Sequence, residues 1–570
     1  VERKESNMTD PHQMLDLWLE KVEDAELKRE LEDLKRSGDE AAIADAFFQD
    51  LSFGTAGLRG IIGAGTNRMN VYTVGRATQG FSDYLNAHFE EPSIAIGRDS
   101  RNMGEEFVRR AAEVFAANGV KVFVYPRIEP VPALSFATRD LKCSGGVCVT
   151  ASHNPAPYNG YKAYGPDGCQ ITTQASKDVS DAIMKVDPFS DVRSIPFDEA
   201  LSDGIVAWIG EDTMERYIEA VLDQSVVLDD DSESKAALKL VYTPLNGAGI
   251  ECVSKILDRV GITDVTVVPE QAVPDGDFPT CPYPNPEIRE ALERGIQLCE
   301  QVKPDLLLAT DPDADRVGTA VKDGDEYILL TGNEMGVLLL DYIARVKQAK
   351  GESLTDKFAV STIVSSTMID ALADEYGFAI KRVLTGFKYI GEFIGQLEQA
   401  NQADRFMFGF EESYGYLNGT HVRDKDAVDA SMLICEMAQY YKQHGMNLAQ
   451  AMRALYEKHG FYQNKTVSYS YPGADGHERM DAIMGALRTV SLANIAGIEV
   501  SGVVDYLQGI DGLPAANVIE FRLDNGDKVI VRPSGTEPKI KAYLFARGAT
   551  LEAAHEAVGK YEAAIEKLLG

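Results

Sequence analysis

The chain has 570 residues, of which 45% are hydrophobic, 25% charged and 8% aromatic, and its formal net charge is −33. This composition is typical of a folded globular protein and excludes a largely disordered one. A chain of 570 residues is too long for one ordinary hydrophobic core, so we expect several domains. Because so large a negative charge repels nucleic acid and anionic membranes, neither is expected as a partner.

The seven cysteines are scattered along the chain and lack the paired spacing of a structural zinc site. The first residues are charged with no apolar signal segment behind them, and no later apolar run has membrane-spanning length. These features predict reduced, buried thiols and a cytoplasmic location. The oligomeric state stays open between a monomer and a dimer.

In chain order, residues 12–35 combine apolar positions at helical spacing with many charges, which predicts an amphipathic helix or a helix pair. Further along, short apolar runs precede turn residues and then a helical stretch, a pattern that indicates parallel α/β units. Such runs begin near residues 93, 238, 305 and 357. At least three α/β modules are therefore expected.

The last part of the chain has a different pattern. Two strands are expected at residues 518–523 and 528–531, joined by an Asn525-Gly526 turn, and a closing helix at 551–569. This order favours an α+β domain. Polar and turn residues interrupt the periodic segments, and from them we expect four domains: residues 1–205, 206–323, 324–461 and 462–570.

Ser152 is the first candidate for chemistry. It lies in the segment Thr-Ala-Ser-His-Asn-Pro, directly after the apolar residues 146–149, and so at the C-terminal end of an expected strand. Sheets of α/β proteins place reacting groups at this end, which makes the hydroxyl a candidate nucleophile. Taken alone, the same residues are also typical of a plain turn.

Three carboxylates, Asp311, Asp313 and Asp315, stand at alternate positions in a loop after another expected strand. This spacing lets all three converge on one hard cation, for which Mg²⁺ is the natural candidate. An EF-hand would need Gly and Glu where this chain has Arg316 and Lys322, so that type of calcium site is excluded. A solvated acidic turn is the alternative, although three such close carboxylates repel one another.

Near the C-terminus, the segment from Arg532 to Lys539 reads Arg-Pro-Ser-Gly-Thr-Glu-Pro-Lys after a strand. Its cations, hydroxyls and glycine can surround a phosphate group, although Pro, Ser and Gly also build plain loops. The segment around Glu411 and Ser413 offers carboxylates and a hydroxyl suited to sugar hydroxyl groups. Two earlier segments, 53–60 and 97–101, pair glycine with arginine, a combination that can meet an oxyanion.

In their order along the chain, the segments around Ser152, at Asp311 to Asp315, around Glu411 and from Arg532 to Lys539 together resemble those of the α-D-phosphohexomutase superfamily, which includes phosphoglucomutases and phosphomannomutases. The resemblance spans nearly the whole chain. It implies four domains around a central cleft, three related α/β domains with mixed sheets and a C-terminal α+β domain. Each domain would carry one part of the site. Domain 1 would carry the serine loop around Ser152, and domain 2 the metal loop from Asp311 to Asp315. Domain 3 would carry two sugar loops, around Gly386 and Glu411, and domain 4 the phosphate loop from Arg532 to Lys539. One departure is Phe410, which stands where many relatives have Gly directly before Glu.

The resemblance also implies roles for individual residues. Ser152 would be the phosphoserine and would share the Mg²⁺ ion with Asp311, Asp313 and Asp315. Four positions match the family's reaction centre: Arg59, His153, Lys162 and Lys425. Substrate binding is implied for Thr385, Gly386, Glu411, Ser413, Arg316, Arg532, Ser534, Gly535 and Thr536.

The implied reaction is the interconversion of glucose 1-phosphate and glucose 6-phosphate through a phosphoserine and glucose 1,6-bisphosphate. Mannose or pentose phosphates are alternative substrates for the same mechanism. The chain is longer than the shorter bacterial phosphomannomutase branch, and its helical N-terminal extension resembles the branch of phosphoglucomutases related to phosphopentomutases. A serine hydrolase is disfavoured, since the Gly-x-Ser-x-Gly elbow is absent. A catalytically silent sugar-phosphate-binding protein is the non-enzyme alternative.

Overall fold

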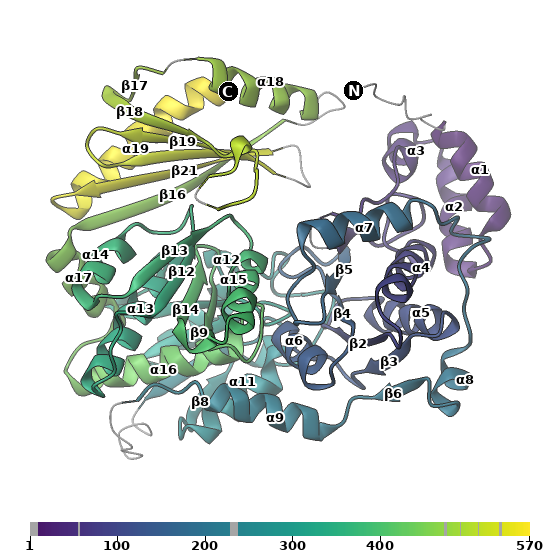
Figure 1. Ribbon diagram of the computed structural model, residues 1–570, viewed down its shortest axis with the longest axis horizontal. Helices are drawn as coiled ribbons and strands as arrows, with labels where there is room; N and C mark the ends of the chain where they lie inside the picture. The colour runs from purple at the N-terminus through teal and green to yellow at the C-terminus, as the bar shows by residue number, and fades with distance from the viewer. Residues whose placement is uncertain are drawn as a thin grey trace.

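The structure is a computed structural model that describes residues 10–54, 57–227, 238–471, 476–490, 492–510, 512–534 and 539–570. Four sheets follow one another along the chain, with six, five, four and six strands. In Figure 1 the first sheet lies at the right in blue, and the last stands at the upper left in yellow-green. No described helix combines the length and apolar character needed to cross a lipid bilayer.

Three helices precede the first sheet, and an aspartate caps each of them. The side chains of Asp10, Asp24 and Asp39 accept hydrogen bonds from the first backbone N–H groups, which would otherwise lack partners. Trp18 packs edge-on against Phe47 at a centroid distance of 5.9 Å. The helix pair expected at residues 12–35 is confirmed, and a third helix follows it. The helices are α1 Pro11–Lys21, α2 Ala25–Ser37 and α3 Glu40–Phe47.

The first sheet has the strand order β1-β5-β4-β2-β3-β6, and it is mixed: β5 pairs antiparallel with β1 and β4, and the rest are parallel. Every residue of β4 is buried, as expected for a strand covered on both faces. The strands are β1 Gly57–Ile61, β2 Ser93–Arg98, β3 Lys121–Val124, β4 Gly145–Val149, β5 Tyr158–Tyr164 and β6 Val206–Trp208. The helices are α4 Val71–His88, α5 Gly104–Ala117, α6 Val131–Asp140, α7 Thr173–Ile183 and α8 Phe197–Ser202.

The second sheet has the order β11-β10-β9-β7-β8, with parallel pairing among β9, β7 and β8 and a hairpin at the other edge. The strands are β7 Lys239–Thr243, β8 Asp264–Val267, β9 Leu306–Thr310, β10 Val317–Asp323 and β11 Glu326–Leu330. The helices are α9 Glu211–Leu222, α11 Gly249–Arg259, the 3₁₀ helix η1 Pro269–Gln271 and α12 Arg289–Val302.

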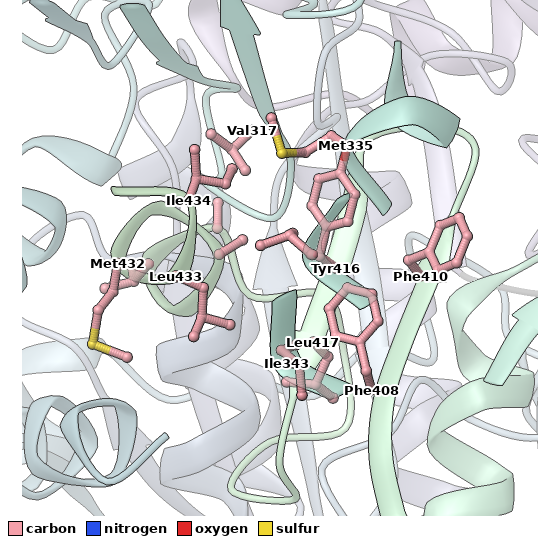
Figure 2. Close-up of a cluster of buried hydrophobic side chains, with 14 of the residues drawn as sticks. Val317, Met335, Ile343, Phe408, Phe410, Tyr416, Leu417, Met432, Leu433 and Ile434 are labelled. Carbon is pink, nitrogen blue, oxygen red and sulfur yellow. The ribbon is translucent and has the colours of Figure 1, made fainter. Parts of the chain in front are cut away.

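The third sheet has the order β13-β12-β14-β15, and its apolar core is continuous with residues of the second sheet, among them Leu308 of β9 and Val317 of β10. Figure 2 shows Phe408 and Tyr416 of this sheet beside Met335 of α13, with Val317 of β10 and Ile434 of α16 nearby. The strands are β12 Phe358–Thr362, β13 Ala379–Val383, β14 Phe406–Glu411 and β15 Gly415–Asn418. The helices are α13 Gly332–Ala349, α14 Met368–Tyr376, α15 Phe387–Gln399, η2 Ala403–Arg405, α16 Ala427–Gln443 and α17 Leu448–His459.

The fourth sheet is antiparallel throughout, in the order β16-β21-β20-β19-β18-β17. Side chains of α18 and α19 share a core with its strands, while a second apolar cluster joins the sheet to Ile363, Val364 and Leu384 of the third domain. The strands are β16 Phe461–Ser470, β17 Asn494–Ile495, β18 Ile498–Asp505, β19 Ile519–Leu523, β20 Lys528–Pro533 and β21 Lys539–Gly548. The helices are α18 Gly476–Thr489, η3 Tyr506–Gln508 and α19 Leu551–Leu569.

The expected class, three α/β domains with mixed sheets and a C-terminal α+β domain, is confirmed. Two expected boundaries cut through sheets. The boundary at residue 205 precedes β6, which pairs with β3, and the boundary at 323 splits the β10–β11 hairpin. The polar residues around position 323, which suggested a linker, form the turn between β10 and β11. We propose domain boundaries that follow the sheets, near residues 210, 331 and 460.

Candidate active site

A cavity of about 950 Å³ lies where the four domains meet. Its walls include residues that precede or follow strands in every one of the four sheets. Nine residues singled out from the sequence line it: Arg59, His153, Arg316, Thr385, Gly386, Glu411, Ser413, Arg532 and Ser534. The fold thus brings together segments that are hundreds of residues apart, and the cavity is large enough for a small-molecule substrate.

Ser152 lies just beyond the end of β4, as expected, and it is 3% exposed. Its backbone has a φ of +52°, a left-handed conformation that is uncommon and strained for residues other than glycine. The hydroxyl donates a hydrogen bond to Oδ2 of Asp311 at 3.0 Å, and Nδ1 of His153 lies 3.1 Å from the same serine oxygen. The turn therefore aims the serine hydroxyl at the aspartate loop.

The three aspartates follow β9 and are buried, and oxygen atoms of their carboxylates lie within 4.8 Å of one another. Backbone N–H groups of Asp315 and Arg316 donate to Oδ1 of Asp311, which fixes the loop. Burial and the nearby charges of Asp313 and Asp315 raise the pKa of Asp311 well above its usual range. Nearby positive charge would therefore favour the ionised form of Asp311.

Two lysines supply part of this charge. Nζ of Lys162 lies 2.7 Å from Oδ2 of Asp313 and 3.0 Å from Oδ2 of Asp315, and Nζ of Lys425 lies 3.1 Å from Oδ2 of Asp315. Burial alone would lower the pKa of Lys162, but the charges of Asp313 and Asp315 outweigh it and raise that pKa. Both ammonium groups are therefore charged at the inner end of the site.

The donor set suits a hard divalent cation. Oδ1 of Asp313 and Oδ1 of Asp315 are buried and have no hydrogen-bond partner among the described residues. A buried carboxylate oxygen without a partner carries a desolvation cost that a bound cation would relieve. Three carboxylates and a serine oxygen are the all-oxygen ligands that Mg²⁺ prefers.

His153 lines the cavity beside Ser152. Burial lowers the pKa of its ring well below the usual range, and the charges of Arg316 and Arg59 lower it further. The imidazole is therefore neutral near pH 7 and can accept a proton at one ring nitrogen.

Arg101, in the Gly-Arg-Asp-Ser-Arg segment, contacts backbone as well as an anion, because its Nε also lies 3.4 Å from Oδ2 of buried Asp99. The residue is 2% exposed, and its guanidinium donates to the carbonyl oxygens of Ser152, Asn154, Pro155 and Tyr158. The sequence could not reveal this role, because backbone acceptors carry no side-chain signal. Arg101 holds the serine loop in its strained shape.

The two sugar-facing loops expected from the sequence meet in the structure. The backbone N–H of Gly386 donates to Oε1 of Glu411 at 2.8 Å, so the carboxylate is oriented by the other loop. The N–H of Val317 donates to the carbonyl oxygen of Tyr414, which ties the metal loop to the same region. Phe410 does not line the cavity; it is buried and belongs to the apolar core of the third domain, where Figure 2 labels it.

Arg532 and Ser534 of the phosphate loop line the cavity on the side of the fourth domain. Gly535 and Thr536 lie outside the described residues, so their expected role is not addressed by the structure. Lys541 and Tyr543 of β21 line the same wall and were not singled out from the sequence. Both stand at alternate positions of β21, which pairs with the strand that carries Arg532, and this alternation could have indicated from the sequence that they face the same wall.

Two arginines lie between the serine loop and the sugar loops. Nη1 of Arg59 donates to Oδ1 of Asn154 at 3.0 Å. Arg316 pairs with Glu287, and Nε of Arg316 lies 3.8 Å from Oδ1 of Asp315. Glu287 was missed in the sequence because it lies in a loop without a distinctive motif, yet it fixes the arginine at the cavity wall.

Comparison with known proteins agrees with this arrangement. Models of phosphoglucomutase/phosphomannomutase α/β/α domains I, II and III match residues 50–189, 215–324 and 331–459. A phosphoglucomutase of Staphylococcus aureus is 35% identical over 551 residues, which are 93% of this chain and 95% of that protein. One of Staphylococcus saprophyticus is 32% identical over 540 residues, with the same shares covered.

Solved structures share the fold. Parafusin of Paramecium, described as a phosphoglucomutase in an open form, superposes with a TM-score of 0.69 at 16% identity, covering 92% of this chain and 95% of its own. A putative phosphomannomutase of Thermus thermophilus gives a TM-score of 0.67 at 23% identity, covering 91% and 99%. The family models and the extent of the staphylococcal matches settle the assignment: the chain belongs to the phosphoglucomutase/phosphomannomutase family.

Proposed function

We propose that this mutase interconverts glucose 1-phosphate and glucose 6-phosphate through a phosphorylated Ser152 and a glucose 1,6-bisphosphate intermediate. The observation that carries the proposal is the hydrogen bond from Ser152 to Asp311, inside a buried carboxylate cluster that adjoins a cavity with a second cationic wall. The staphylococcal relatives named phosphoglucomutases support glucose as the sugar.

In the first half-reaction, the bond between phosphorus and Oγ of phosphorylated Ser152 breaks as a hydroxyl of the sugar monophosphate bonds to phosphorus. Neutral His153 accepts the proton of that hydroxyl. Lys162 and Lys425, held by the aspartates, balance negative charge near the transferring group. Glu411 and Ser413 orient the sugar by accepting and donating hydrogen bonds to its hydroxyl groups.

The bisphosphate must then turn so that its other phosphate faces Ser152. This requires a second site that accepts either phosphate, and Arg532, Ser534 and Lys541 line the cavity wall where such a site would lie. We extend the site to Gly535 and Thr536 on the family pattern. A phosphatase would not need this wall, so its cations favour isomerisation over hydrolysis.

We assign Mg²⁺ to Asp311, Asp313 and Asp315, with Ser152 as an additional ligand. When bound, the ion would neutralise charge on the transferring phosphoryl group. Chelation with EDTA is expected to abolish turnover and Mg²⁺ to restore it. Asp313→Asn should lower the affinity for Mg²⁺ by at least about tenfold, because it removes a charged ligand atom. The metal titration of mutase activity measures this, and unchanged affinity would refute the assignment.

The choice of sugar has a direct test. We expect glucose 1-phosphate to be turned over faster than mannose 1-phosphate, N-acetylglucosamine 1-phosphate or ribose 1-phosphate in a side-by-side rate comparison. A ribose rate equal to or above the glucose rate would move the assignment to a phosphopentomutase. Absence of turnover with all four, together with tight binding, would instead identify a silent sugar-phosphate-binding protein.

We further propose a cytoplasmic location. The seven cysteines are buried and free in the structure, which suits a reducing compartment. Fractionation of the source cells with an activity assay tests the location, and activity recovered outside the cytoplasmic fraction would contradict it.

A further inference from the structure

A second cavity, of about 370 Å³, lies between the third and fourth sheets. It shares no lining residue with the active-site cavity. An apolar cluster lies between the two cavities and includes Ile363, Val364, Ile530 and Phe545. Val364 and Phe545 line the active-site cavity, while Ile363 lines the second cavity. The second cavity is therefore a separate site at the contact between two domains.

Among the charged side chains of its lining, basic ones outnumber acidic ones. Four basic residues, Lys381, Arg382, Arg522 and Lys528, line it with two acidic ones, Asp370 and Glu520. This excess is notable in a chain whose net charge is −33, because most of the surface repels anions. The basic residues come from β13 of the third domain and from β19 and β20 of the fourth, so an anion here would contact both domains.

Lys528 is the most enclosed of these cations. Its ammonium donates to the carbonyl oxygen of Ile363 at 3.0 Å and lies 4.6 Å from the centre of the Phe545 ring. It makes no salt bridge with a carboxylate of the described part of the chain. Burial lowers the pKa of Lys528 to about 8; the charge of Glu520 opposes this shift, and the charges of Arg382 and Arg522 add to it. An anion placed beside it would supply the missing partner.

Arg382 and Arg522 complete the polar side. Nη2 of Arg382 donates to Oδ1 of Asp370 at 3.1 Å, and Nε of Arg522 donates to Oε1 of Glu520 at 2.7 Å. Both guanidinium groups are therefore already oriented. The remaining lining is largely apolar and includes Ile380, Val504, Ile510 and Leu513. A ligand that fits both sides has an anionic end and an apolar body.

We propose that this cavity binds a small organic phosphate, with the phosphate between Lys528, Arg382 and Arg522 and the organic group against the apolar wall. The ligand bridges the third and fourth domains and strengthens the contact between them. Neither Ser152 nor the aspartates take part, so the failure of this proposal would leave the proposed mutase reaction untouched.

Hydrogen–deuterium exchange of the full chain tests the site, with phenyl phosphate and inorganic phosphate as probes and sodium chloride of equal ionic strength as reference. Exchange should slow at residues 379–383, 504–510 and 519–530, and phenyl phosphate should slow it more than inorganic phosphate. Slowing confined to segments of the active site would overturn the proposal. Equal slowing by both probes would overturn the part assigned to the apolar wall.

Two variants locate the effect. Lys528→Met should lose the slowing at these three segments, while Lys560→Met, at an exposed lysine of α19 in the same domain, should keep it. If Lys528→Met does not fold, Arg522→Met serves instead, because that side chain is 59% exposed. Slowing that persists in the folded cavity variants would refute the site.

Discussion

At the scale of single residues, the serine loop is held by a side chain, that of Arg101, which does not line the active-site cavity. Arg101 donates to four backbone carbonyl oxygens of the serine loop, while Ser152 adopts a left-handed conformation at the tip. The strain at Ser152 is balanced by hydrogen bonds that exist only in this loop shape. We therefore expect the proposed reactivity of Ser152 to depend on Arg101.

Arg101→Lys tests this dependence. A lysine cannot donate to four carbonyl oxygens in a fixed plane, so the serine hydroxyl should move away from Asp311. We expect kcat to fall by roughly 10- to 100-fold with little change in KM, since misplacement by about 1 Å can cost 100-fold in rate. Steady-state kinetics on the folded variant measures it.

Arg98→Lys is the matched control, because Arg98 belongs to the same segment but its guanidinium makes, among the described residues, a single ion pair, with Glu105 at 3.7 Å. It should leave kcat nearly unchanged. A wild-type kcat in folded Arg101→Lys would show that the serine loop keeps its shape without the guanidinium.

The sequence predicted the role of a residue where that role depends on the chemistry of its own side chain. The three aspartates are the clearest case, because their spacing already implies a shared cation. The sequence did not predict the contacts of Arg101, Glu287 and Lys541. Their neighbours are backbone carbonyl groups or residues of distant loops. Those contacts exist only once the domains have packed.

At the scale of helices and strands, the sequence predicted elements well where apolar runs alternate with turns. The strand expected near residue 93, the strands expected at 518–523 and 528–531 and the closing helix at 551–569 are all observed. The β10–β11 hairpin was missed because its polar turn resembles a linker, and pairing between adjacent strands is not visible in composition. Phe410, an apparent irregularity in the sugar loop, is a core residue of β14.

Packing between α13 and β14 has a specific requirement. A Cβ atom at Gly336 would lie 2.3 Å from the Phe410 ring, closer than side chains approach one another. Gly336→Ala should therefore destabilise the protein by about 1–3 kcal/mol, through displacement of the ring or the helix. Urea unfolding followed by circular dichroism measures the free energy.

Gly559→Ala is the control for helix propensity alone, because nothing lies within 4 Å of its Cβ position on α19. It should stabilise the protein by about 0.5–1 kcal/mol. Equal effects of the two substitutions would mean that α13 does not pack against Phe410 as described.

At the scale of the whole molecule, the domains meet through buried polar groups as well as apolar ones. Glu129 of the first domain is 3% exposed and accepts a weak hydrogen bond from Cys252 of α11 in the second domain. Burial raises the pKa of Glu129 to about 7, although Arg127 opposes the shift. The first two domains therefore pack best when Glu129 is protonated.

This coupling makes stability depend on pH. Because the folded-state pKa is raised, the contribution of Glu129 is fully present below about pH 4.5 and is lost as pH rises through about 7. Relative to Glu129→Gln, the wild type should lose roughly 1–3 kcal/mol of unfolding free energy between pH 5 and 8. Urea unfolding of both proteins at the two pH values measures the difference.

Glu211→Gln, at an exposed carboxylate that pairs with the same Arg127, should show a difference from wild type that hardly changes with pH. If Glu129→Gln behaved in the same way, Glu129 would be ionised in the folded protein across this range.

The central claim is that Ser152 carries the phosphoryl group between turnovers, and mass spectrometry of the intact chain with peptide mapping tests it most directly. After incubation with glucose 1,6-bisphosphate and Mg²⁺, the account predicts one phosphoryl group on Ser152, released when excess glucose 6-phosphate is added. Ser152→Ala should carry none and should lose mutase turnover. Normal turnover by Ser152→Ala, or a phosphoryl group located on another residue, would contradict the account.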